Sequence, residues 1–194
     1  PNIPQFAVTM AAVLRGGFTC VNVNPLYTAR ELEHQLKDSG ATAIVILENF
    51  AHTLESVIEK TPIKHVALAS MGDLLGFWQG HWITFAVRHL AKMVPAFKLP
   101  LNSARTVTHF KDCLSLGAGR KLSQPTVTMD SIAFLQYTGG TTGLSKGAVL
   151  THRNIVAAVL QAEAWFRPAL KRVGDPSAMN MIAALPLYHI FALG

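Results

Sequence analysis

Residues 42–70 read TAIVILENFAHTLESVIEKTPIKHVALAS, and this stretch alternates two kinds of pattern. The run at 42–47 is apolar and rich in β-branched residues, which is typical of a parallel strand covered on both faces. Residues 51–61 are predicted as a helix, and residues 65–70 return to a strand pattern. Strand, helix and strand in this order predict a βαβ unit and a parallel sheet.

The residues before this stretch extend the same alternation. Residues 4–16 predict a buried helix closed by two glycines, and residues 18–25 predict a strand that stops at a proline. The next predicted helix begins with a capping box, in which Thr28 is followed three residues later by Glu31, and it ends at Gly40. The first third of the chain therefore predicts repeated βαβ units with flanking helices.

The composition is typical of a chain with a large core. The chain has 194 residues, of which 50% are hydrophobic and 14% charged, and this balance argues against disorder. Cys20 and Cys113 lack metal-ligand spacing, so neither a zinc site nor a disulfide framework is indicated, and a reducing cytoplasm fits best. The sequence shows no signal peptide and no run of about 18 uncharged apolar residues. Because it starts without Met and stops within an apolar run, we expect a fragment of a longer protein.

Positive charge is concentrated in the middle of the chain. Between Lys60 and Lys121 there are nine Lys or Arg residues and only two Asp residues, whereas the remainder is close to neutral. Such a segment attracts a phospholipid surface, a nucleotide, a nucleic acid or an acidic partner, or it is simply a solvated cationic face. No recognisable nucleic-acid-binding motif accompanies the charge, so we expect no nucleic-acid partner.

Residues 72–124 break the βαβ alternation and are predicted as a basic amphipathic insert followed by a connector. Within residues 74–98, large side chains recur every three or four positions, at Leu74, Trp78, Trp82, Phe85, His89 and Met93. A helix with this stripe and nearby Lys and Arg can lie on an anionic membrane surface with its tryptophans at the headgroups. The alternative is that the stripe packs on the core of the domain.

A glycine- and threonine-rich segment, YTGGTTGLSKGAVLTHRN at residues 137–154, stands between a predicted strand at 131–138 and a predicted helix. Glycines let the backbone approach phosphate oxygens, hydroxyls donate hydrogen bonds to them, and a lysine neutralises their charge. A Walker A loop is excluded because Leu144 and Ser145 stand where that motif requires Gly and Lys, and the glycine spacing also excludes the dinucleotide motif. His152 and Asn154 are expected to cap the helix that follows.

This segment resembles the phosphate-loop signature of the adenylate-forming ligase superfamily, with Gly139 and Ser145 where Ser and Pro are common. Residues 16–46 and 184–194, GGFTCVNVNPLYTARELEHQLKDSGATAIVI and ALPLYHIFALG, are similar to long-chain fatty-acyl-CoA ligases. The resemblance implies an α/β fold that is part of the large N-terminal domain of such a ligase. Its expected parts are βαβ units at 1–71, the basic amphipathic insert and connector at 72–124, and the phosphate loop and start of the acyl pocket at 125–194. The C-terminal domain is expected to be absent.

The resemblance implies fatty acid activation in two steps. ATP and a long-chain fatty acid, with Mg²⁺, give an acyl-adenylate and pyrophosphate, and coenzyme A then displaces AMP. Catalytic roles are implied for Lys146, Thr141 and His189, and a place near Mg²⁺ for Thr138. The residues expected to bind the nucleotide are Tyr137, Thr138, Gly139, Gly140, Thr141, Thr142, Gly143, Lys146 and Gly147.

The fatty acid is expected beside His189 and Phe191, although a buried, hydrogen-bonded histidine is the alternative reading of His189. Two alternatives to the leading function stay open: an adenylate-forming ligase for another carboxylic acid, and a membrane-surface docking module of such an enzyme. The expected partners are fatty acid, ATP and coenzyme A, with an anionic membrane surface at residues 74–98 as a further option. The expected location is the cytoplasm, with peripheral contact to the inner face of the membrane as the matching option. The chain by itself is expected to be inactive, because the acidic motif and catalytic lysine of such ligases come later in the sequence.

Overall fold

The computed structural model of the chain describes residues 1–100, 104–138, 145–173 and 184–189. The chain forms two compact units. Unit 1 comprises residues 1–2, 12–24 and 124–194, and unit 2 comprises residues 3–11 and 25–123. The boundary falls within helix α1 (Pro4–Arg15).

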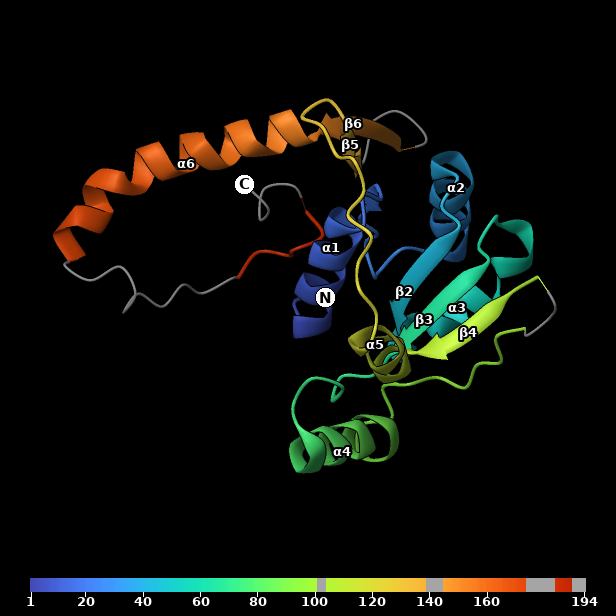
Figure 1. The fold of residues 1–194 in the computed structure, drawn as a ribbon. Coiled ribbons are helices and arrows are strands. Elements are labelled where there is room, and N and C mark those ends of the chain that lie inside the picture. The colour runs from blue at the N-terminus through green and yellow to red at the C-terminus, as the bar shows by residue number, and fades with distance from the viewer. Residues whose placement is uncertain (101–103, 139–144, 174–183, 190–194) are drawn as a thin grey trace. The chain divides into compact units, whose positions relative to one another are not determined.

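Unit 2 contains a parallel sheet of three strands, β2 (Ala43–Leu47), β3 (His65–Ala69) and β4 (Thr106–His109), in the order β2-β3-β4. The three strands lie side by side in Figure 1. Between β2 and β3 the chain forms η1 (Glu48–Phe50), α3 (Ala51–Glu55) and η2 (Ile58–Lys60). The predicted βαβ unit is therefore confirmed, but the helix expected at 51–61 is broken into short pieces.

Helix α2 (Ala29–Ser39) begins and ends where the sequence predicts. The Thr28 side chain accepts a hydrogen bond from the Glu31 backbone N–H, and the Glu31 carboxylate accepts one from the Thr28 N–H at 2.8 Å. Gly40 closes the helix in the left-handed conformation, with φ of 64°. These bonds satisfy amide groups that a helix end would otherwise leave unpaired.

The core of unit 2 lies between the sheet and the short helices. Leu54 and Ile58 are fully buried, and Val66 and Leu68 of β3 are nearly so. Helix α1, in contrast, is not the buried helix that the sequence predicts, because Gln5 is its only buried residue. The Gln5 side chain donates to the carbonyl of Ser70 at 2.8 Å, so a polar contact fixes this helix end.

Residues 72–124 contain more regular structure than the predicted insert and connector. They include α4 (Phe77–Phe85), the π-helix η3 (Ala86–Leu90), strand β4 and α5 (Phe110–Ala118). Strand β4 pairs in parallel with β3, with His65 opposite Thr106. The partner of β4 lies about 40 residues earlier, and four residues of mixed polarity carry too weak a local pattern to reveal the strand. The division at 1–71, 72–124 and 125–194 stays a prediction.

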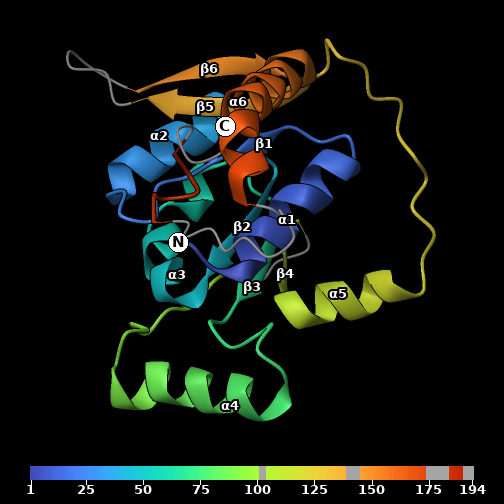
Figure 2. The same cartoon turned by 90° about the vertical axis from the view of Figure 1, so that its left-hand side faces the viewer.

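Unit 1 contains a second sheet, with β1 (Cys20–Val21), β5 (Ile132–Thr138) and β6 (Lys146–Thr151) in the order β1-β5-β6. Strand β1 is parallel to β5, and β6 is antiparallel to it, as the two long strands in Figure 2 show. Helix α6 (His152–Val173) follows β6 directly. In the described parts of the chain no helix combines the length and the apolar character needed to cross a bilayer.

Candidate functional site

The glycine- and threonine-rich segment connects two antiparallel strands. Thr138 at the end of β5 lies opposite Lys146 at the start of β6, and Tyr137 lies opposite Gly147. The sequence placed Lys146 and Gly147 in a loop between a strand and a helix, and that placement is wrong. Their pairing with β5 makes this region a β-hairpin, which the sequence does not reveal because the pairing depends on a strand across the turn.

Several predicted nucleotide-binding residues lie outside the described residues. They are the loop positions Gly139, Gly140, Thr141, Thr142 and Gly143, together with Phe191 of the predicted acyl pocket. The described part of the site therefore consists of the two strand ends that hold the loop and the neighbouring segment 184–189.

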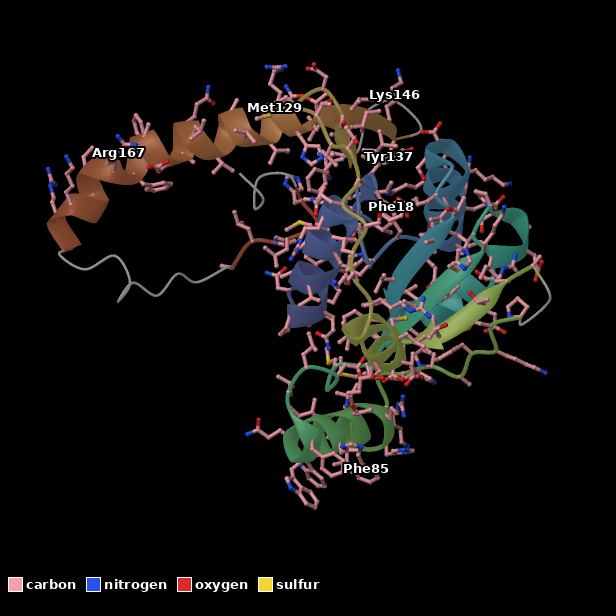
Figure 3. The ribbon with its side chains drawn as sticks, in the orientation of Figure 1. Phe18, Phe85, Met129, Tyr137, Lys146 and Arg167 are labelled. Atoms are coloured by element: carbon pink, nitrogen blue, oxygen red, sulfur yellow. The ribbon has the colours of Figure 1, made fainter. Side chains whose placement is uncertain are left out.

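Thr138 and Lys146 form the chemical part of the hairpin. Residues directly opposite each other in an antiparallel pair project from the same face of the sheet. Both side chains are exposed, so a hydroxyl and an ammonium group are presented together where the loop begins and ends. Figure 3 labels Lys146 at this end of β6. This pair favours an anionic ligand.

Tyr137 and Gly147 form the structural part. Tyr137 is buried, and a Cβ added to Gly147 would lie 3.0 Å from the Tyr137 ring. An aromatic ring of β5 thus packs closely against the backbone of residue 147, and a side chain at this position would require the ring to shift slightly. Tyr137 and Gly147, expected at the nucleotide, support the hairpin in the described structure.

The structure shows a polar network of Asn22, Gln136 and Tyr188 at strand β5 that the sequence did not predict. The Asn22 side chain donates to the Gln136 side-chain oxygen at 3.2 Å, and the Gln136 amide donates to the carbonyl of Tyr188, also at 3.2 Å. Asn22 and Gln136 are both buried. The one local signal is a glutamine inside an otherwise apolar strand, since a buried amide requires partners.

This network places the predicted residue His189 beside the hairpin strand. His189 donates its backbone N–H to the carbonyl of Pro186 at 2.9 Å and so closes a turn. This turn contains Tyr188, whose carbonyl accepts the hydrogen bond from Gln136. The Asn2 side chain holds the same segment through Leu185 and Leu187. His189 is exposed, so the alternative of a buried histidine is wrong.

Helix α6 begins with a cap built from Thr151 and Asn154. The Asn154 side chain accepts from the Thr151 N–H at 2.9 Å, and the Thr151 hydroxyl accepts from the Asn154 N–H at 3.3 Å. Asn154 thus belongs to the cap, as predicted. The N-cap residue itself is Thr151 rather than His152, whose N–H donates to the carbonyl of Ser131.

The described part of the site, at the two strand ends and in residues 184–189, carries no carboxylate of its own. The sequence has no Asp or Glu between residues 131 and 162, and Asp130 is paired with Arg153 at 3.0 Å. Among the described residues there is no cluster of three or more His, Cys, Asp or Glu side chains. Thr138 offers a single neutral oxygen, whereas Mg²⁺ prefers carboxylate and phosphate oxygens. A hydroxyl and an ammonium group fit the phosphates of a nucleotide better than they fit a metal ion on its own.

Cys20 of strand β1 carries a partly buried thiol in this sheet, and its burial disfavours the thiolate. Burial raises the pKa of its thiol from the ordinary value of 9.0 to about 11. Only the thiolate is reactive, so the site depends on its oxygen and nitrogen groups.

A three-stranded sheet with an exposed cation and hydroxyl at the two strand ends that flank a glycine-rich segment is typical of an α/β protein that binds phosphate groups. Residues 1–194 match the family described as AMP-binding enzyme. The chain belongs to this family.

Curated relatives agree with this assignment. The chain is 49% identical over 193 residues to the long-chain-fatty-acid–CoA ligase of Salmonella typhimurium, and 50% identical over 194 residues to that of Haemophilus influenzae. A ligase of the same description from Bacillus subtilis is 29% identical over 194 residues. The comparisons cover 100% of this chain and 33% of each relative, so the chain spans a third of their length.

Solved structures show the same fold. A long-chain-fatty-acid–CoA ligase from Archaeoglobus fulgidus matches with a TM-score of 0.56 at 23% identity, over 99% of this chain and 30% of that one. A protein from Rhodopseudomonas palustris, described as a putative long-chain-fatty-acid CoA ligase, matches with a TM-score of 0.68 at 16% identity, over 99% and 38%. The α/β fold with parallel sheet elements is therefore that of the large domain of adenylate-forming ligases, as predicted.

Proposed function

We propose that this chain is part of a long-chain fatty acid–CoA ligase. The observation that carries the proposal is the hairpin, in which Lys146 and Thr138 face each other at the two ends of a glycine- and threonine-rich loop. The near-half identity to curated ligases of that description supports the same substrate class. On this proposal ATP, Mg²⁺ and coenzyme A are the cofactor and co-substrates.

The hairpin would hold the β- and γ-phosphates of ATP. Lys146 supplies the positive charge, and Thr138, with Thr141, Thr142 and the loop amides of Gly139, Gly140 and Gly143, supplies hydrogen-bond donors. The Thr138 hydroxyl is the proposed contact to Mg²⁺. Tyr137 and Gly147 lie opposite each other next to this pair, and their close packing supports the register that sets Lys146 opposite Thr138.

The reaction needs charge stabilisation rather than a protein nucleophile. A carboxylate oxygen of the fatty acid attacks the α-phosphorus of ATP, and pyrophosphate leaves with the electron pair of the broken P–O bond. The thiolate of coenzyme A then attacks the acyl carbon and AMP leaves. Fixed cations and N–H groups near the departing pyrophosphate lower the barrier of the first step. Lys146 and the loop are the proposed source of this stabilisation.

His189 and Phe191 are the proposed contacts to the fatty acid. Two hydrogen bonds support a position for His189 near the nucleotide. Gln136 of β5 accepts one from Asn22 and donates the other to the carbonyl of Tyr188, the residue before His189. An exposed histidine in this turn can contact a carboxylate or an acyl-adenylate. Asn22 and Gln136 act here as positioning residues.

We also propose contact with an anionic membrane surface through residues 74–98, in a cytoplasmic protein that is peripheral at the inner face. The segment has Trp78 and Trp82 exposed and contains no Asp or Glu. A surface of this kind would bring the enzyme to the bilayer, where long-chain fatty acids partition.

The test is an assay of the full-length protein with ATP, coenzyme A and palmitate. The variant with Lys146→Ala and Thr141→Ala should lose about 100-fold or more of its rate, because phosphate contacts stabilise the transition state. Lys171→Ala, an exposed lysine of α6, is the matched control and should keep full activity. Pyrophosphate exchange into ATP with other acids separates the alternatives. Exchange with another acid but not with palmitate would overturn the fatty-acid assignment and leave adenylation standing.

A further inference from the structure

The helical segment α4–η3 presents large apolar side chains to solvent. The aromatic face of α4 consists of Phe77, Trp78, Trp82 and Phe85, and these four residues are exposed to 67%, 82%, 63% and 47%. Leu90 and Met93 continue the exposed apolar surface beyond the aromatic face. Leu74 alone among the predicted stripe packs against the buried cluster of Leu47, Ala69 and Phe110. The stripe therefore does not form the core of unit 2.

The opposite side of the segment is fixed to the sheet of unit 2. Gly72 and Gly80 approach so closely that a Cβ on either would overlap the carbonyl oxygen of the other. The Arg88 guanidinium pairs with the buried carboxylate of Glu48 at 2.6 Å, and the Asn49 side chain donates to the carbonyl of Met93 at 3.0 Å. These contacts hold the segment at the carboxyl ends of β2 and β3, the end of the strands at which α4 lies in Figures 1 and 2. Because these contacts fix the other side of the segment to unit 2, the aromatic face is left exposed.

The exposed rings are also ordered among themselves. Phe77 contacts Trp78 edge-on with ring centroids 5.3 Å apart, and Trp82 stacks on Phe85 at 5.9 Å. Figure 3 shows Phe85 on the side of α4 that points away from the strands. Preorganised aromatic rings lose little conformational entropy when they enter a new environment.

The charge around the aromatic face selects the partner. No Asp or Glu occurs between Leu74 and Lys111, while Lys92 and Lys98 are exposed close to the end of η3. Tryptophan favours the boundary between headgroups and acyl chains, and lysines next to it attract anionic headgroups. The combination of exposed tryptophans, exposed lysines and no carboxylate fits an anionic bilayer, which offers phosphates to the lysines and, directly beneath them, an apolar layer to the rings.

We propose that the aromatic face of α4 inserts into the headgroup region of an anionic membrane, with Lys92 and Lys98 at the lipid phosphates. The inference rests on the proposed membrane contact of residues 74–98. It assigns that contact to the aromatic face of α4, a helix held in place by contacts to unit 2. The Arg88–Glu48 pair holds the segment in place, so the Arg88 charge is already paired within the protein. Unit 2 would contact the membrane through this face.

The test is sedimentation of the full-length protein with vesicles of phosphatidylglycerol and phosphatidylcholine, and with vesicles of phosphatidylcholine alone. We expect binding to the anionic vesicles, and a loss on the order of tenfold or more in the variant with Trp78→Ser and Trp82→Ser. Trp165→Ser, which changes an equally exposed tryptophan of α6, is the matched control and should bind normally. The variant with Lys92→Gln and Lys98→Gln should weaken binding to the anionic vesicles only.

Unchanged binding in the double tryptophan variant overturns the proposal, and so does an equal loss in Trp165→Ser. Equal binding of the unaltered protein to both vesicle types overturns the anionic assignment. The ligase assay with detergent-dispersed palmitate separates this proposal from the proposed enzyme activity. An active protein that ignores vesicles removes the membrane proposal alone, and a vesicle-binding protein without ligase activity removes the enzyme proposal alone.

Discussion

Lys146 and Gly147 are neighbours in β6 with different tasks. Lys146 is exposed opposite Thr138, whereas Gly147 lies under the Tyr137 ring. In a glycine-rich loop motif both residues suggest contact with phosphate. The pairing of the strands leaves the Lys146 side chain exposed and brings the backbone of Gly147 against an aromatic ring.

Gly147→Ala should destabilise the protein by about 1–3 kcal/mol, because the new methyl group would overpack against the Tyr137 ring. Lys146→Ala should leave stability unchanged, since its side chain is exposed. Urea denaturation of both variants, alongside the ligase assay, measures the difference. An unchanged midpoint for Gly147→Ala would show that the ring moves aside freely and that its packing does not set the identity of residue 147.

Cys20 should be slow to react with iodoacetamide. Burial raises its pKa from 9.0 to about 11, so at pH 8 its thiolate fraction is about 100-fold lower than that of a free thiol. The reaction should accelerate as the pH rises toward 11, because deprotonation then becomes favourable. Mass spectrometry of the peptide containing Cys20 follows the rate, with a free cysteine peptide as the reference. Equal rates at pH 8 for the protein and the reference would contradict this prediction.

At the scale of elements, the middle of the chain carries less unpaired positive charge than its sequence indicates, because several of its cations form ion pairs. Arg88 pairs with Glu48, and Arg105 is buried and pairs with Glu59 at 2.8 Å. Lys60 lies 3.7 Å from Glu33. These cations secure elements to one another, so the charge left for a partner comes mainly from the exposed lysines.

Arg88→Ala should cost about 3 kcal/mol and loosen α4, because it leaves the buried Glu48 carboxylate without its cation. The Arg88 guanidinium donates two hydrogen bonds to one oxygen of Glu48, from Nε at 2.9 Å and Nη2 at 2.6 Å. Adding Glu48→Gln to Arg88→Ala should recover part of the loss, since the uncompensated charge is then removed. Thermal unfolding of the single and double variants measures both effects. A double variant less stable than Arg88→Ala would show that charge burial is not the cause.

At the scale of the whole molecule, each unit leaves an apolar helix surface open to solvent. Helix α6 exposes Val159, Leu160, Trp165 and Phe166, at 50%, 58%, 82% and 55%. Figure 1 shows that α6 contacts the β5–β6 hairpin at the N-terminal end of the helix and extends away from it. Exposed apolar surface of this extent favours association.

The 194-residue chain by itself should therefore associate in a concentration-dependent way. Sedimentation velocity over a range of protein concentrations follows this, and the variant with Leu160→Ser and Phe166→Ser should shift the distribution toward monomer. Ser substitutions at exposed positions remove apolar surface without opening a cavity. A monomer at every concentration would show that the α6 surface does not mediate self-association of this chain.

The features that the sequence predicted correctly are local ones. The capping box of Thr28 and Glu31, the helix end at Gly40 and the strands β2, β3 and β5 each depend on residues within a few positions of one another. The phosphate-loop motif is likewise contiguous, so its family could be identified from the residues alone.

The features that only the tertiary structure decided depend on partners far away along the chain. The pairing of β4 with β3, the ion pair of Arg88 with Glu48 and the contacts of Asn22, Gln136 and Tyr188 all join distant segments. The sequence determined that residues 74–98 carry an aromatic stripe with positive charge, but not which way the stripe faces. That direction was decided by the close approach of Gly72 to Gly80 and by the buried Glu48 carboxylate, because a helix turns toward the sheet the side that satisfies buried charge and allows close packing.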